Sequence, residues 1–177
     1  MILKVLAFAA VVVVAVLLFA ATKPNAFRVQ RSIDIHAPPE KIFLLINDFH
    51  NWTRWAPQDR EDSTMRRIYS GPTSGKGAAS QWSSTGKAGK GRLLIAESAP
   101  PSRILVNADF IKPFQSHNLN EFILEPRGAD THVTWTWTVQ GKTPYIMKLM
   151  GIFVNMDRMM GRHFEDGLRN LKSVSEQ

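Results

Sequence analysis

The sequence contains no cysteine, which excludes disulfide bonds, a thiol nucleophile and any thiolate metal site. Acidic residues are scarce as well: 15 Asp and Glu stand against 22 Lys and Arg, and the formal net charge is +7. The imbalance is concentrated between Asp62 and Glu97, where no acidic residue occurs but six basic ones do: Arg66, Arg67, Lys76, Lys87, Lys90 and Arg92. Such a balance favours anionic partners and indicates nothing about the fold.

Motifs for several kinds of ligand are also missing. The five histidines do not have the spacing of metal ligands, so the sequence predicts no metal site. The glycines of Gly71–Gly77 do not form a phosphate-binding loop, because Gly75-Lys76 is followed by another glycine and then by a predicted strand. Neither a nucleic-acid-binding motif nor an aromatic-lined basic groove is present. We therefore expect no cofactor, no metal and no nucleic-acid partner.

One long hydrophobic run is present, at the N-terminus. Val5–Ala21 is 17 residues without a polar group, preceded by Lys4. This is the short end of the range for a transmembrane helix and longer than the apolar part of a typical signal peptide. Cleavage after Ala21 would place Phe19 where a small residue is required, so an uncleaved anchor is favoured over a signal peptide. We expect a single-pass membrane protein with its anchor at residues 1–22 and a linker at 23–26. The side of the membrane is left open.

Beyond the linker, the residue pattern predicts strands and two short helices. Phe27–His36 alternates apolar and polar residues, as a half-buried strand does. A helix over Glu40–Asn47 follows, and Asp48 can cap a second one that ends at Ala56-Pro57. Six further strands are separated by Gly and Pro turn residues: Met65–Ser70, Ala78–Ser84, Gly91–Ser98, Arg103–Ile111, Ser116–Glu125 and Thr131–Gln140.

A long amphipathic helix is predicted over Thr143–Val174, where apolar residues recur with a mean spacing of about 3.6. Its first part, Tyr145–Val154, is apolar nearly all round and must be covered on several sides. It is either a buried core helix or the roof of a hydrophobic cavity. Gly151, Gly161 and Gly167 mark a kink or a close contact. Consecutive strands with short turns and segregated helices predict an α+β domain over 27–177, with the long helix across the concave face of an antiparallel sheet.

Two segments carry a resemblance to a known family. The run from Val29 to Phe43, followed by Trp52-Thr53-Arg54-Trp55-Ala56-Pro57, resembles the opening of the START-like polyketide cyclase/dehydrase and lipid-transport superfamily (SRPBCC). Gly161–Lys172 resembles the end of that family's long helix. The resemblance implies a helix-grip fold, in which a curved seven-stranded antiparallel sheet wraps around a long C-terminal helix and encloses a hydrophobic cavity. Members bind lipids, sterols, hormones or polyketides, and only some are enzymes. A membrane span lies outside the family pattern.

Seven large side chains are the candidate ligand-binding residues, because strand alternation and helical spacing place them on inward faces: Trp82, Phe110, Phe122, Trp135, Trp137, Met150 and Phe153. The alternative is that these rings pack together and fill the core. Asp109 and Glu121 are not predicted to be catalytic, because the same alternation places both on the outward face.

Three functions are consistent with these observations. The leading hypothesis is membrane-anchored binding of a small hydrophobic ligand, a lipid or a polyketide-like metabolite, with the basic loops of 66–92 against anionic lipid. A solvated basic face is the alternative for those loops. The second hypothesis is a cyclase or dehydratase, which requires a proton-moving group inside the cavity. The third is a non-catalytic interaction module whose cavity is filled. The oligomeric state is left open.

Overall fold

The computed structural model describes residues 2–22, 27–58, 62–86, 88–113, 115–141 and 156–177. The order of the described elements is α1 (Ile2–Thr22), β1 (Arg28–Ile35), α2 (Pro39–Asn47), the 3-10 helix η1 (Phe49–Asn51), α3 (Trp52–Trp55), β2 (Arg66–Ser70), β3 (Ala79–Ser83), β4 (Lys90–Ala99), β5 (Arg103–Lys112), β6 (Ser116–Arg127), β7 (Asp130–Gln140) and α6 (Met156–Ser175).

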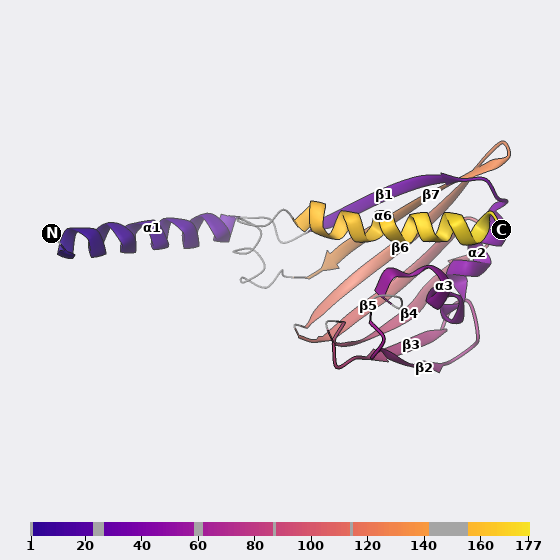
Figure 1. Ribbon diagram of the computed structural model, residues 1–177, viewed down its shortest axis with the longest axis horizontal. Helices are drawn as coiled ribbons and strands as arrows, with labels where there is room; N and C mark the ends of the chain where they lie inside the picture. The colour runs from indigo at the N-terminus through magenta and orange to yellow at the C-terminus, as the bar shows by residue number, and fades with distance from the viewer. Residues whose placement is uncertain (1, 23–26, 59–61, 87, 114, 142–155) are drawn as a thin grey trace.

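The strands form one antiparallel sheet in the order β1-β7-β6-β5-β4-β3-β2. Strands β2 to β7 each pair with their neighbour in the chain, and β1 joins at the far edge beside β7. Helix α6 lies across the sheet, and α2 and α3 lie near its C-terminal end (Figure 1). The predicted fold class, a curved seven-stranded sheet with two short helices after the first strand and a C-terminal helix, is confirmed.

The inward faces of the strands follow the predicted alternation. On β7 the side chains of Val133, Trp135 and Val139 are buried, while Thr134 and Thr138 are partly exposed. A strand whose side chains alternate in this way buries one face and leaves the other to solvent. The core of the molecule therefore lies between the concave face of the sheet and the helices.

Two tryptophans join the short helices into one unit. The indole N–H of Trp52 donates to the carbonyl of Ile46 at 2.8 Å, and that of Trp55 donates to the carbonyl of Leu45 at 3.0 Å. Asp48 caps η1, as predicted for this turn, and accepts from the backbone N–H of His50 at 2.9 Å. Both indole rings are buried. Each indole N–H therefore needs the backbone carbonyl to which it donates. The unit presents an aromatic surface to the sheet.

Helix α6 corresponds to the second half of the predicted long helix. Its apolar stripe is buried, with Phe164, Leu168 and Leu171 each exposed by 2% or less. The predicted first half of the helix, 143–154, falls outside the residues that the structure describes. Whether that segment roofs a cavity therefore stays a prediction.

An ion-pair cluster fastens α6 to the edge strand β1. The Arg31 guanidinium donates to Asp157 Oδ2 at 2.9 Å and to Glu165 Oε1 at 2.8 Å. The hydrogen bond from Arg31 lowers the pKa of Asp157. Gly161 faces the guanidinium, and a Cβ at that position would overlap it. The glycine therefore marks a close contact, one of the two alternatives that the sequence left open.

The apolar run at the N-terminus forms α1, which stands apart from the sheet in Figure 1. Over the described part of the chain, no helix combines the length and the apolarity needed to cross a membrane. The prediction of a transmembrane anchor at residues 1–22, and with it a membrane localisation, is therefore wrong. The prediction depended on a run of 17 apolar residues, which is only the short end of the range for a spanning helix.

Candidate functional site

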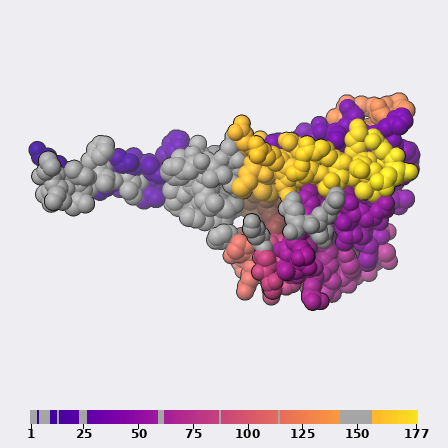
Figure 2. Space-filling model, viewed as in Figure 1, coloured from indigo at the N-terminus to yellow at the C-terminus, as the bar shows by residue number. Residues whose placement is uncertain are grey.

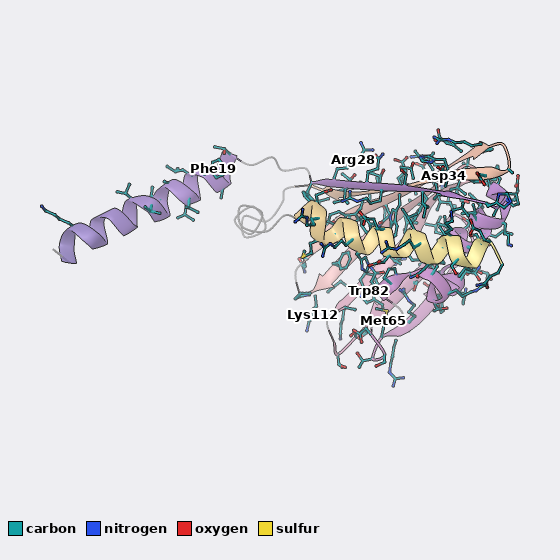
Figure 3. The ribbon with its side chains drawn as sticks, turned by 45° about the horizontal axis from the view of Figure 1, so that its top comes forward. Phe19, Arg28, Asp34, Met65, Trp82 and Lys112 are labelled. Carbon is teal, nitrogen blue, oxygen red and sulfur yellow. The ribbon has the colours of Figure 1, made fainter. Side chains whose placement is uncertain are left out.

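A cavity of about 200 Å³ lies on the concave side of the sheet. Strands β2 to β7 supply most of its wall, α6 closes it with Met160 and Phe164, and α3 contributes Trp52. The space-filling view shows α6 covering one part of this face, with the segments from α2 to β3 next to it (Figure 2). Trp82 and Met65, which line the cavity, lie on the opposite side of α6 from Arg28 and Asp34 of β1 (Figure 3).

Trp135 is the centre of the aromatic wall. Its ring stacks on Phe122 with centroids 5.0 Å apart, and on Phe164 of α6 at 4.3 Å. Helix α6 can approach this closely because Gly167 faces the indole: a Cβ there would lie 2.9 Å from Trp135 Cζ3. Aromatic pairs at such separations add to the energy of burial. The ring is therefore held rigidly, with one edge on the cavity.

Trp82 and Phe110 form a second aromatic pair, near the β3–β4 turn. Their centroids are 5.1 Å apart in an edge-to-face arrangement, and Trp82 Nε1 donates to the carbonyl of Ala88 at 2.9 Å. Gly91 is the register partner of Trp82 on β4, and a Cβ at that position would overlap the indole. The glycine is thus required for Trp82 to lie flat against the sheet.

Of the seven predicted ligand-binding residues, Trp82, Phe110, Trp135 and Trp137 line this one cavity. Phe122 is not in its lining: it is fully buried behind Trp135 and packs against the α3 tryptophans. Met150 and Phe153 lie outside the described residues. That these side chains bind a ligand stays a prediction.

Two buried asparagines on β6 were missed by the sequence analysis. Asn118 and Asn120 share the inward face of the strand with Phe122, and they are only 2% and 6% exposed. The signal was present in the sequence, since counting back from Phe122 in steps of two reaches both. Asn118 lies beside Ala108 of the cavity wall, and its Oδ1 has no hydrogen-bond partner in the part of the chain that the structure describes.

Asn120 itself lines the cavity, and its orientation follows from its partner. Trp135 Nε1 donates to Asn120 Oδ1 at 2.9 Å. An indole N–H can only donate, so the amide oxygen must face it and the amide nitrogen must point elsewhere. No described residue accepts a hydrogen bond from this Nδ2 group. Asn120 therefore presents a donor at an otherwise aromatic wall.

Arg67 is the second polar group that the sequence analysis misplaced. It was grouped with the basic loops, but it lies on the inward face of β2, opposite Trp82 of β3, and it lines the cavity. Its Nη1 donates to Ser80 Oγ at 2.9 Å, and Ser80 is fully buried. The exposed Ile68 obscured the alternation, because an apolar residue is not expected on the outward face of an edge strand.

The other basic residues of this stretch point away from the cavity. Arg66, Lys76, Lys90 and Arg92 are exposed, and Lys87 lies outside the described residues. The expected contact of these side chains with anionic lipid is not supported. They remain a positively charged surface beside the cavity.

A hydrogen-bond cluster around Asp62 fixes the rim of the cavity. Its carboxylate accepts from Ser84 Oγ at 2.5 Å, from Thr64 Oγ1 at 2.6 Å and from the backbone N–H of Ala88 at 3.3 Å. These bonds, with Ser84 the largest cause, lower the pKa of Asp62 to about 2. The cluster ties the segment before β2 to the β3–β4 turn, between Met65 and Ala88 of the cavity wall.

The carboxylates predicted to face outward are on the convex face of the sheet. Asp109 pairs with His117 at 2.8 Å, and Glu121 pairs with Arg103 at 2.7 Å. Among the described residues, no group of three or more His, Cys, Asp or Glu side chains could hold a metal ion. The described cavity wall is thus aromatic, with Arg67, Asn120 and Gln58 as its polar side chains.

Solved structures share this architecture at low sequence identity. Protein CV1439 from Chromobacterium violaceum is 15% identical, over 88% of this chain and 99% of its own, with a TM-score of 0.59. The Helicobacter pylori protein jhp0584 is 9% identical, over 84% of this chain and 88% of its own, with a TM-score of 0.62. DynU16, from the dynemicin biosynthetic locus, is 13% identical, over 85% of this chain and 47% of its own, with a TM-score of 0.57. At these identities the likeness shows the fold alone.

Sequence comparison gives a family as well as a fold. Residues 26–176 match the family described as "Polyketide cyclase / dehydrase and lipid transport". The match covers the sheet, the short helices and all of α6, and it begins just after α1. No curated protein is detectably similar to the chain.

Proposed function

We propose that this chain, which belongs to the polyketide cyclase/dehydrase and lipid transport family, binds a small hydrophobic ligand between its sheet and α6. The observation that carries the proposal is the arrangement of Trp82, Phe110, Trp135 and Trp137 around one cavity. Concave, mostly apolar sites with a few placed polar groups are typical of small-molecule binding. The open volume argues against an interaction module with a filled core.

The size of the cavity limits the ligand. Sites for drug-sized molecules measure about 300–1,000 Å³, whereas this cavity measures about 200 Å³. An apolar cavity of about 150 Å³ is known to bind benzene. The proposal therefore favours a compact metabolite of one or two rings over a complete lipid.

The enzymatic alternative, cyclisation or dehydration, needs a side chain that moves protons. The charged side chain in the described lining is Arg67. A guanidinium stays protonated, so it can polarise a carbonyl but cannot act as a general base. The alternative is distinguished by turnover, that is, by release of an isomer of the bound ligand after cyclisation or of a product lighter by one water after dehydration.

Native mass spectrometry of the full-length protein, purified gently, tests the proposal. We expect a discrete bound mass that organic solvent extracts. Phe110→Ala should reduce the bound fraction about tenfold or more, because Phe110 lines the cavity and truncation removes apolar contact. Ile111→Ala is the matched control, since Ile111 is the next residue and is exposed. The proposal is overturned if no species is bound and if a panel of compact lipids and polyketide-like compounds does not bind.

A further inference from the structure

We infer that Asp62 is a positioning residue for ligand binding: it holds the backbone of Ala88, and Ala88 in turn fixes the indole of Trp82 at the cavity. The inference rests on the proposed function, because Trp82 belongs to the wall of the same cavity. Asp62 is not itself part of that wall. It acts on the ligand through the position of the ring.

Ala88 is the link between the two side chains, because both of its backbone groups are engaged. Its N–H donates to Asp62 Oδ2 at 3.3 Å, and its carbonyl accepts from Trp82 Nε1 at 2.9 Å. Ala88 and Trp82 both line the cavity. A shift of Ala88 therefore moves the acceptor of the indole N–H, and the ring must follow it or lose its hydrogen bond.

The carboxylate of Asp62 divides its hydrogen bonds between two segments. Oδ1 accepts from the backbone N–H and the hydroxyl of Thr64, at 3.0 Å and 2.6 Å. Oδ2 accepts from Ser84 Oγ at 2.5 Å and from the N–H of Ala88, both in the β3–β4 turn. An ionised carboxylate only accepts, and each of its oxygens has two donors here. Asp62 thus joins the segment that leads into Met65 to the turn that holds Trp82.

The β3–β4 turn passes close to this carboxylate. The N–H of Gly86 donates to Ser84 Oγ at 2.7 Å, and a Cβ at Gly86 would lie 2.7 Å from Asp62 Oδ2. At the base of the turn, the N–H of Ser84 donates to the carbonyl of Gly89 at 2.8 Å. The bond at the base brings the two ends of the turn together, whereas Asp62 determines where its interior lies.

The indole of Trp82 depends on this support because its other contacts are apolar. Its ring meets the edge of Phe110 with centroids 5.1 Å apart, and Gly91 leaves room for it on β4. These contacts fix the face of the ring, and the hydrogen bond to Ala88 fixes its polar edge. A binding site whose supporting groups are loose loses affinity, since the ligand must then order the wall.

The indole N–H signal of Trp82 tests the link between the residues without any ligand. In NMR spectra of the full-length protein, assigned with Trp82→Phe, Asp62→Ala should shift this signal and raise its hydrogen-exchange rate about tenfold or more. The indole signals of Trp52 and Trp55 should stay in place, because these groups donate to carbonyls of α2. A general loss of stability would change all three signals.

Ligand affinity tests the consequence for binding, with naphthalene as a flat hydrophobic probe. Asp62→Ala should weaken binding about fivefold, because part of the cavity wall is no longer held. In a Trp82→Phe background, which lacks the indole N–H, the same change should weaken binding less than about 1.5-fold. Asp130→Ala is the control, since the carboxylate of Asp130 pairs with His36 at the opposite end of the sheet. It should leave the affinity unchanged in both backgrounds.

Ser84→Ala is a milder variant that serves if Asp62→Ala does not fold. It removes one of the two donors to Asp62 Oδ2 and the acceptor of the Gly86 N–H. The Trp82 indole signal should shift in the same direction as in Asp62→Ala, by a smaller amount.

The outcomes separate the inference from the proposed function. An unchanged Trp82 indole signal in both variants, or an equal loss of naphthalene affinity with and without the indole N–H, would overturn the inference and leave the proposal of a hydrophobic ligand standing. If neither naphthalene nor any compound of the mass-spectrometry panel binds the unaltered protein, the proposed function and the role of Asp62 in binding are both overturned.

Discussion

At the scale of single residues, the side chains of the cavity show what alternation along a strand can and cannot predict. It placed Trp82, Phe110 and Trp135 on the inward face, and the structure places them there. It could not predict depth: Phe122 is on the same face but lies behind Trp135. Alternation gives a direction from the sheet, whereas the distance to the cavity depends on how neighbouring rings stack.

The same rule would have found Asn120 had it been applied to every side chain of the strand. It was used to exclude Asp109 and Glu121, which the structure does place on the convex face in ion pairs. An amide on an inward face is less evident as a candidate functional group than a carboxylate, because it carries no charge. Buried polar side chains are nevertheless the informative exceptions in an apolar wall.

Asp62 gives a prediction about pH. Its pKa is lowered to about 2 in the folded protein, from an ordinary value of 3.8. A carboxyl group whose pKa is depressed by folding contributes stability above its unfolded value, and this stability is lost as the pH falls through the folded value. The contribution of Asp62 should therefore be complete above about pH 4 and fade towards pH 2.

The measurement is the melting temperature of Asp62→Asn against the unaltered protein between pH 2 and pH 7. The variant should be less stable at pH 7, and the difference should shrink as the pH falls below 4. Glu125→Gln is the control, since Glu125 is exposed and lies away from the cluster. A difference that stays constant across the whole range would contradict the assignment.

At the scale of elements, the contact between β1 and α6 decides how the cavity is closed. Arg31 reaches Asp157 and Glu165 across a helix surface that Gly161 keeps flat. The two carboxylates are about half exposed, so each ion pair by itself contributes little. The shape of the contact, with no Cβ beneath the guanidinium, is therefore the more important feature.

Gly161→Ala should displace the Arg31 guanidinium, so that it stabilises the protein by less than the helix propensity of alanine predicts. The added methyl group overlaps the Arg31 guanidinium. Moving the guanidinium away breaks two half-exposed ion pairs, which contribute up to about 1 kcal/mol each, whereas the gain in helix propensity is about 1 kcal/mol. The free energy of unfolding in urea measures the balance.

A double-mutant cycle isolates the cause of this effect. Arg31→Met removes the guanidinium and should let Gly161→Ala stabilise the protein by the full gain in helix propensity. Equal effects of Gly161→Ala in both backgrounds would mean that the overlap with Arg31 is not the reason for the glycine.

At the scale of the whole molecule, the sequence predicted the sheet and its helices because strands with strict alternation and clear turns leave few alternatives. It failed at the N-terminus, where the length of an apolar run and an unsuitable cleavage site were taken as evidence for a membrane anchor. The cavity volume could not be predicted from the sequence either, because it depends on packing between elements far apart in the chain.

Binding of the proposed hydrophobic ligand should raise the stability of the whole domain. A ligand that binds only the folded state at ten times its dissociation constant adds about 1.4 kcal/mol to the free energy of unfolding. For a chain of 177 residues, this corresponds to a rise of about 3–6 °C in melting temperature. Differential scanning fluorimetry with the ligand identified by native mass spectrometry measures it. Ile111→Ala should show the full shift and Phe110→Ala a smaller one, and equal shifts would argue against a role for Phe110 in binding.

The position of α6 in the chain has a consequence for synthesis. The hydrogen bonds between Arg31 and its partners on α6 join residues 126 and 134 positions apart. All seven strands leave the ribosome before α6 does, so the nascent sheet displays Trp135 and its aromatic neighbours to solvent or to a chaperone until residues 156–175 emerge. Transiently exposed apolar surface of this kind promotes aggregation. In a chain that stalls or terminates before α6, this aromatic face stays uncovered and can be recognised by chaperones and proteases. In the finished chain, α6 covers it.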